Sequence, residues 1–230
     1  MQAVILAAGR GTRLKPLTDK TPKPLLEIAD GMTIADRILD VLPARVKDVI
    51  FVVNHLEEQI RARYGTEARG KNIFYVTHEK LDGTAKALWA CSHLLGDNYL
   101  VLHGDDIYDP QDLEKIADHP LALLAHERHG VPTGGHVLVD EKGHLANIRD
   151  YPEIAAGRHL LNTGAYSLNK TFFAYEPELI NAASNEYGLP QTLAKIARDH
   201  EVKVHRANSY MQINTPEDLR RARRMLKEES

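Results

Sequence analysis

Strand-length apolar runs alternate along the first hundred residues with segments whose apolar positions recur every three or four residues. The runs lie at residues 2–6, 49–53, 73–76 and 99–102, and the helical spacing occurs at 34–42, 56–64 and 84–95. A strict alternation of this kind predicts an α/β fold with a mostly parallel central sheet. In such folds ligands bind at the carboxyl ends of the strands.

The second half of the chain has a different pattern. Apolar residues at 137–139 and 144–148 flank a turn at 140–143, which predicts a hairpin. A strand near 159–166 and helices near 171–182 and 188–199 are expected to follow. The last helix has a clear start, because Thr215 can cap it, Pro216 suits its first turn and Asp218 completes a capping box.

The composition excludes several classes of protein but does not by itself identify the function. At 230 residues a single domain is the natural expectation, with residues 1–110 and 111–230 as its two halves. No apolar stretch is long enough to span a membrane, and the N-terminus lacks the features of a signal peptide. The single cysteine, Cys91, allows no intrachain disulfide and fits a reducing, cytoplasmic location. The slightly negative net charge of −3 gives no general argument for a nucleic-acid partner.

Positive charge is nonetheless concentrated at the N-terminus. Residues 1–25 contain five basic side chains and a single acidic one, Asp19. A small, highly anionic ligand would explain this excess, and a solvated basic loop is the alternative. Four arginines in the last helix are better explained as a solvated helix face, since acidic residues lie beside them.

The strongest chemical signal is the segment 6–18, Leu-Ala-Ala-Gly-Arg-Gly-Thr-Arg-Leu-Lys-Pro-Leu-Thr, with Pro-Lys-Pro-Leu at 22–25. A strand here leads into a loop with two glycines, whose backbone N–H groups can hold phosphate oxygens. Arg13 can form two hydrogen bonds to a phosphate, and the prolines on either side of Lys23 favour an extended backbone that fixes its position. The loop is neither a P-loop nor a dinucleotide fingerprint, because it lacks the closing Gly-Lys-Ser/Thr and a third glycine.

A second signal lies at 100–106, where an apolar strand ends in Asp105 and Asp106. Two carboxylates at a strand end can hold a divalent cation together with substrate phosphates, and Mg²⁺ prefers such ligands. A turn or helix cap is the ordinary alternative for an Asp-Asp pair. The twelve histidines show no zinc-type spacing, and nothing indicates a serine or cysteine nucleophile.

Together these segments closely resemble the sugar-phosphate nucleotidyltransferase family, which opens with Leu-Ala-Ala-Gly-x-Gly-Thr-Arg-Leu-x-Pro-Leu-Thr and a Pro-Lys-Pro-Leu. The resemblance implies a Rossmann-like, three-layer α/β/α fold, the nucleotide-diphospho-sugar transferase fold. It implies that Arg13 and Lys23 are catalytic, and that Asp105 binds Mg²⁺. Residues 1–110 would then bind the nucleotide and 111–230 the acceptor. The nucleotide-binding positions that it implies are Leu6, Ala7, Ala8, Gly9, Gly11, Thr12, His78, Gly83 and Thr84.

The sequence departs from the family at several of these places. His78 stands where relatives that use uridine or thymidine often carry a base-reading glutamine, so the nucleobase stays open; a simple strand-end residue is the alternative. On the acceptor side, the resemblance is looser and implies Asp150, Asn162, Gly164 and Glu186.

The usual second metal-binding aspartate is replaced by Gln212, and Asn214 is the other candidate for that role. Because a neutral amide oxygen is a weaker ligand for Mg²⁺ than a carboxylate, an unusual metal site or reduced activity is one consequence to consider.

The sequence therefore predicts an enzyme that couples a nucleoside triphosphate to a sugar 1-phosphate and releases pyrophosphate. Two alternatives stay open: a cytidylyltransferase acting on a phospho-alcohol such as phosphocholine or inositol phosphate, and a regulator that binds nucleotide with little turnover. Little sequence follows the last helix, so no appended acyltransferase domain is expected. A homo-oligomer is left open, and no nucleic-acid or membrane partner is expected.

Overall fold

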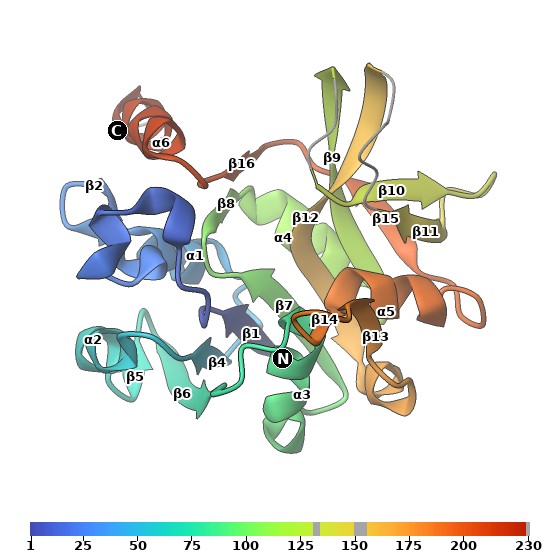
Figure 1. The fold of residues 1–230 in the computed structure, drawn as a ribbon, viewed down its shortest axis with the longest axis horizontal. Coiled ribbons are helices and arrows are strands. Elements are labelled where there is room, and N and C mark those ends of the chain that lie inside the picture. The colour runs from blue at the N-terminus through green and yellow to red at the C-terminus, as the bar shows by residue number, and fades with distance from the viewer. Residues whose placement is uncertain (131–133, 150–155, 229–230) are drawn as a thin grey trace.

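The computed structural model describes residues 1–130, 134–149 and 156–228. A ten-stranded sheet forms its centre (Figure 1), in the order β11-β10-β12-β7-β1-β4-β6-β5, with β9 pairing to β12 and β15 pairing to β9. Its parallel part contains β1 (Gln2–Leu6), β4 (Asp48–Val53), β6 (Lys71–Thr77) and β7 (Asn98–His103). The remaining strands are β5 (Glu67–Ala68), β9 (Ala122–Gly130), β10 (His136–Val139), β11 (Leu145–Arg149), β12 (Gly157–Asn169) and β15 (Lys203–Arg206).

The central parallel strands β1, β4 and β7 form because their apolar runs are buried on both faces of the sheet. In β4, for example, every residue from Val49 to Val53 is fully buried. Alternate residues face opposite sides, so Val49 and Phe51 belong to one core and Ile50 and Val52 to the other.

Helices cover both faces and give three layers. The first core packs against α1 (Ile34–Val41), α2 (Glu57–Tyr64), α4 (Pro110–Ala117) and α6 (Pro216–Glu228). The second packs against α3 (Thr84–Ala90) and α5 (Leu189–Ile196). The predicted α/β/α architecture with a mixed sheet and a parallel nucleus is thus confirmed.

Three small ladders lie outside the main sheet. They are β2 (Glu27–Ala29) with β3 (Met32–Thr33), β8 (Asp106–Tyr108) with β16 (Tyr210–Gln212), and β13 (Glu178–Asn181) with β14 (Glu186–Gly188). Short 3₁₀ turns occur at Thr12–Leu14, Leu17–Asp19, Lys23–Leu25, Ser92–Leu94 and Lys170–Ala174.

The helix predicted near 171–182 is wrong. A 3₁₀ turn occupies Lys170–Ala174, and Glu178–Asn181 forms strand β13. Pro177 explains the difference, because proline disfavours helical geometry in the residue before it and cannot donate a helical hydrogen bond. The helix predicted for 84–95 is shorter, since α3 ends at Ala90. In the part of the chain that the structure describes, no helix is long and apolar enough to cross a membrane.

Candidate active site

The loop after β1 is held in a tight conformation by one glycine. Gly11 has φ +60°, and a Cβ placed there would lie 2.8 Å from Cγ2 of Thr18. The Thr18 hydroxyl also donates to the Gly11 carbonyl at 2.8 Å. Because a side chain at position 11 is excluded by both backbone angle and space, the loop can lie close against the segment that follows it.

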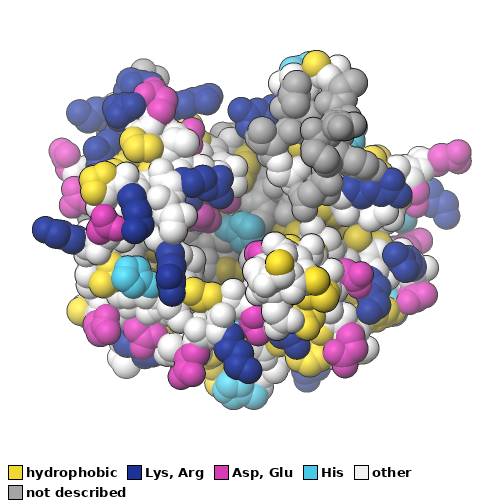
Figure 2. Space-filling model, viewed as in Figure 1, with side chains coloured by type: hydrophobic (Ala, Val, Ile, Leu, Met, Phe, Trp, Pro, Cys, Tyr) yellow, Lys and Arg dark blue, Asp and Glu magenta, His cyan; other side chains and the backbone are white. Residues whose placement is uncertain are grey.

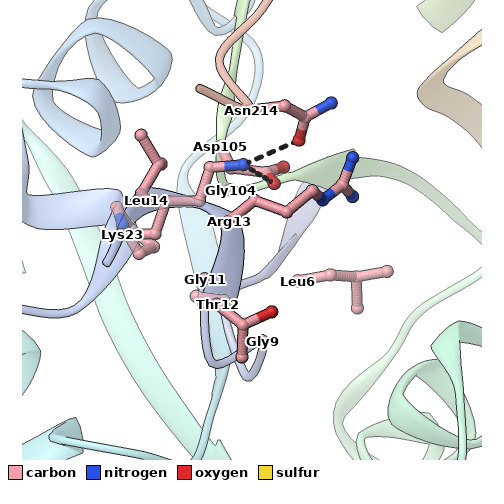
Figure 3. Close-up of a pocket in the computed structure, with 12 residues that line it drawn as sticks. Leu6, Gly9, Gly11, Thr12, Arg13, Leu14, Lys23, Gly104, Asp105 and Asn214 are labelled. Atoms are coloured by element: carbon pink, nitrogen blue, oxygen red, sulfur yellow. Dashed lines mark hydrogen bonds and ion pairs between the residues drawn. The ribbon is translucent and has the colours of Figure 1, made fainter. Parts of the chain in front are cut away.

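Lys23 brings a positive charge into this region. It begins the 3₁₀ turn after the extended Pro22, and its side chain is only 8% exposed. Its Nζ lies 2.6 Å from Oδ2 of Asp105 and donates to Oδ1 of Asn214 at 3.2 Å (Figure 3). One ammonium group therefore joins three segments that are far apart in the sequence.

The end of β7 lies against the end of β1. The Gly104 amide donates to the Leu6 carbonyl at 3.0 Å, and a Cβ on Gly104 would lie 3.0 Å from that same oxygen. This close approach sets Asp105 beside the glycine loop. The next residue, Asp106, is fully buried, and that burial, with the neighbouring Asp105 charge, raises the pKa of its carboxyl well above the usual range.

Asn214 is positioned from two sides. It follows β16, whose Gln212 pairs with Asp106 in the antiparallel ladder with β8. It also precedes α6, where the carboxylate of Asp218 accepts hydrogen bonds from the Asn214 and Thr215 amides at 3.0 and 2.8 Å. The Asp218 amide in turn donates to the Thr215 hydroxyl, so the capping box predicted for this helix is confirmed.

These groups surround a cavity of about 220 Å³ at the carboxyl ends of β1 and β7. Figure 2 shows this face of the molecule hollowed, with Lys and Arg side chains gathered to the left of the hollow. Arg13 and Lys23 extend their side chains over the same side of the loop (Figure 3). The lining residues are Leu6, Ala7, Gly9, Gly11, Thr12, Arg13, Leu14, Lys23, Pro24, Gly104, Asp105 and Asn214.

The donor set fits a divalent cation. Asp105 and Asn214 each direct an oxygen at the same ammonium ion, so both oxygens already converge on one positive charge. In addition, donor atoms of His103, Asp105 and Asp106 lie within 4.8 Å of one another. Carboxylate and amide oxygens are the hard ligands that Mg²⁺ accepts.

A second group of predicted residues lies where α3 meets β14. Gly83 has φ +103°, and a Cβ there would lie 2.2 Å from the Tyr187 carbonyl oxygen. The Thr84 hydroxyl accepts a hydrogen bond from the Leu189 amide at 3.0 Å. Glu186 opens β14 and is half-buried. The predicted nucleotide residues Gly83 and Thr84 thus lie against the segment that carries an acceptor candidate.

His78 directly follows β6 and is buried. Its Nε2 lies 3.0 Å from Oδ1 of Asp82, at ion-pair distance but without hydrogen-bond alignment. Burial lowers the pKa of His78, although Asp82 acts to raise it, so the neutral imidazole is favoured. His78 is not among the residues that line the cavity.

Asn162 and Gly164 lie on β12, beside the end of β7. The Asn162 amide donates to the Tyr166 hydroxyl at 2.6 Å, and its carbonyl oxygen accepts from the Gly164 amide. Gly164 has φ +74°, and a Cβ there would lie 2.3 Å from Nδ1 of His103. The absence of a side chain at Gly164 therefore leaves the space that the His103 ring occupies. His103 precedes Asp105 by two residues in the sequence.

Not every predicted residue is brought to the cavity. Gln212 is exposed and outside its lining, Ala8 is buried and also outside the lining, and Asp150 lies outside the described residues. His103, which joins the candidate metal group, is not among the site residues predicted from the sequence. Its place directly before the Gly-Asp-Asp sequence was the signal that could have identified it.

The fold and the site define an α/β protein with a cavity at the carboxyl ends of its parallel strands, lined by a glycine loop, two cationic side chains and a carboxylate. The chain belongs to the nucleotidyl transferase family, whose model matches residues 2–229. Proteins of this family are typically dependent on a divalent metal.

Three similar proteins illustrate the relationship. The bifunctional protein GlmU of Methanocaldococcus jannaschii is 27% identical over 227 residues, which cover 98% of this chain and 54% of GlmU. The chain thus spans about half the length of the GlmU-type relatives it matches. The UTP–glucose-1-phosphate uridylyltransferase AglF of Haloferax volcanii is 27% identical, with 100% of this chain and 98% of AglF covered. The crystal structure of a UDP-glucose pyrophosphorylase complexed with UDP-glucose superposes with a TM-score of 0.82 at 16% identity, covering 100% and 99% of the two chains.

Proposed function

We propose that this chain joins a nucleoside triphosphate to a sugar 1-phosphate and releases pyrophosphate. The observation that carries the proposal is the convergence of Arg13, Lys23, Asp105 and Asn214 on one cavity beside the glycine loop. Membership of the nucleotidyl transferase family supports the same activity, and so does the similarity to AglF, which extends over nearly the whole of both chains. Residues 1–110 bind the nucleotide in this proposal, and 111–230 bind the acceptor.

The chain's own residues supply positioning and positive charge. The backbone of residues 6–12 holds the triphosphate, while Arg13 and Lys23 neutralise charge on the reacting phosphates. Asp105 and Asn214 hold Mg²⁺, which when bound supplies further charge neutralisation. An acceptor phosphate oxygen attacks the α-phosphorus, the bond to the β-phosphate bridging oxygen breaks, and pyrophosphate leaves. Because the acceptor phosphate is already ionised at neutral pH, the reaction needs no strong general base.

A pyrophosphate-release assay tests this activity directly. The four common ribonucleoside triphosphates and thymidine triphosphate are combined with hexose 1-phosphates, phosphocholine and an inositol phosphate. The proposal expects release with a sugar 1-phosphate. Release with phosphocholine or inositol phosphate alone would favour a cytidylyltransferase, and nucleotide binding without release under any condition would favour a regulator.

Arg13→Ala tests the assigned role of the guanidinium. Removing one preorganised positive group from the reacting phosphates is expected to lower kcat by about 10²–10³-fold. Arg10→Ala is the matched control, because Arg10 is exposed in the same loop but does not line the cavity. Equal rates for the two variants, with both proteins folded by circular dichroism, would contradict the assignment.

A further inference from the structure

The antiparallel ladder between β8 and β16 determines where the two candidate cation ligands meet. Asp106, the first residue of β8, pairs with Gln212, the last residue of β16. In an antiparallel pair, the start of one strand and the end of the other lie at the same end of the ladder. Asp105, which precedes β8, and Asn214, which follows β16, therefore emerge together, and both contact the Lys23 ammonium.

One side-chain hydrogen bond joins the two strands of this ladder. The Tyr210 hydroxyl donates to Oδ2 of Asp106 at 3.0 Å, across 104 residues of sequence. Asp106 is fully buried, and a buried polar group such as this carboxyl is costly to leave without a hydrogen-bond partner. The Tyr210 ring also packs against the rings of Tyr108 and His126, at centroid distances of 6.0 and 5.6 Å. Each strand has only three residues, so this bond adds to a short backbone ladder.

We infer that Tyr210 is a positioning residue for the cation site: its hydrogen bond to Asp106 holds the β8–β16 ladder so that Asp105 and Asn214 present their oxygens to one ion. Among the residues that the structure describes, Tyr210 makes no hydrogen bond to either of these two ligands, and it acts through Asp106. The inference rests on the proposed function only in that it concerns the same site. Groups in such outer positions typically change metal affinity or activity by 10–100-fold when they are removed.

The test is a titration of the protein with Mn²⁺ in the absence of nucleotide. Binding is measured by the relaxation of water protons, which detects weakly bound Mn²⁺. Tyr210→Phe keeps the ring and its packing but removes the hydroxyl, and the Mn²⁺ dissociation constant is expected to rise by about tenfold or more. Tyr75→Phe is the matched control, because the Tyr75 hydroxyl donates at 2.7 Å to the Gly65 carbonyl, away from the cavity. Thermal unfolding of each variant shows how much of the effect is on stability alone.

A second variant approaches the same ligand from the other side. Asp218→Asn weakens the hold on the Asn214 backbone from α6, without touching the buried ladder, and is expected to raise the Mn²⁺ dissociation constant in the same direction. An unchanged constant in folded Tyr210→Phe would overturn the inference. So would the absence of Mn²⁺ binding to both the unsubstituted protein and Lys23→Met, since no cation site would then exist. Pyrophosphate release by the unsubstituted protein is measured separately, so a failure of the proposed activity is distinguishable from a failure of this inference.

Discussion

Lys23 holds a positive charge where a metal ion would share the same ligands. Its ammonium lies 2.6 Å from Asp105 and 3.2 Å from Asn214, and the side chain is nearly buried. Two positive charges a few ångströms apart repel one another, and partial burial strengthens that repulsion. In the free protein, a divalent cation would therefore compete with the ammonium for these oxygens, and bound phosphates would offer the ammonium other partners.

Lys23→Met is accordingly expected to have opposite effects on binding and on turnover. Loss of the competing charge should tighten Mn²⁺ binding in the absence of nucleotide by about tenfold, or about 1.4 kcal/mol. Turnover should fall by about 10²–10³-fold, because a preorganised positive group is lost. Lys20→Met, at an exposed position three residues earlier, provides the control for both measurements. Weaker Mn²⁺ binding in folded Lys23→Met would show that the lysine assists the cation instead of competing with it.

At the level of the elements, the strands of the parallel core and most helices could be predicted from the apolar pattern. The run at 49–53 and the spacing at 34–42 correspond to β4 and α1, because burial on one or both faces imposes a period on the sequence. The β8–β16 ladder could not be predicted in this way. Each strand has three residues, too few for a period, and their pairing depends on tertiary contacts such as that of Tyr210 with Asp106.

The same distinction applies to the site. The glycine loop, Arg13 and Lys23 lie close together in the sequence and form a recognisable pattern, whereas the sequence alone does not choose between Gln212 and Asn214. The structure places Asn214, and not Gln212, beside Asp105. No local pattern separates the two, since they lie two residues apart and only the geometry after β16 decides which one points inward.

The close contact between α3 and β14 at Gly83 is expected to contribute to the stability of the fold. In Gly83→Ala, the new Cβ would lie 2.2 Å from the Tyr187 carbonyl oxygen, in addition to the strain of φ +103°. Gly143→Ala is the matched control, because Gly143 also has positive φ (+78°) but nothing within 4 Å of an added Cβ. The control should lose about 1–2 kcal/mol from backbone strain alone, and Gly83→Ala clearly more, in the free energy of unfolding measured with urea. Equal losses would mean that β14 moves away from α3 at little cost.

At the scale of the whole molecule, five histidines are affected alike by the packing of the fold. Burial lowers the pKa of each of them, with smaller contributions from neighbouring charges: His78, His103, His126, His136 and His205. Their native forms are therefore neutral in a range where the unfolded chain begins to take up protons. The free energy of unfolding of the whole fold is thus expected to depend on pH near neutrality, because these histidines are spread over several elements.

The sign of this coupling follows from proton counting. Below the ordinary histidine pKa of about 6.5, the unfolded state binds more protons than the native state, so the free energy of unfolding falls as the pH is lowered. Each histidine that only the unfolded chain protonates contributes up to about 1.4 kcal/mol per pH unit. Urea unfolding at pH 8, 7, 6 and 5.5 should show stability that is level at the alkaline end and declines below pH 7, and His126→Gln, which removes one such group from β9, should make the decline shallower. A stability that stays level or rises between pH 7 and 5.5 would mean that these imidazoles take up protons in the native protein as readily as in the unfolded chain, and that their burial does not keep them neutral.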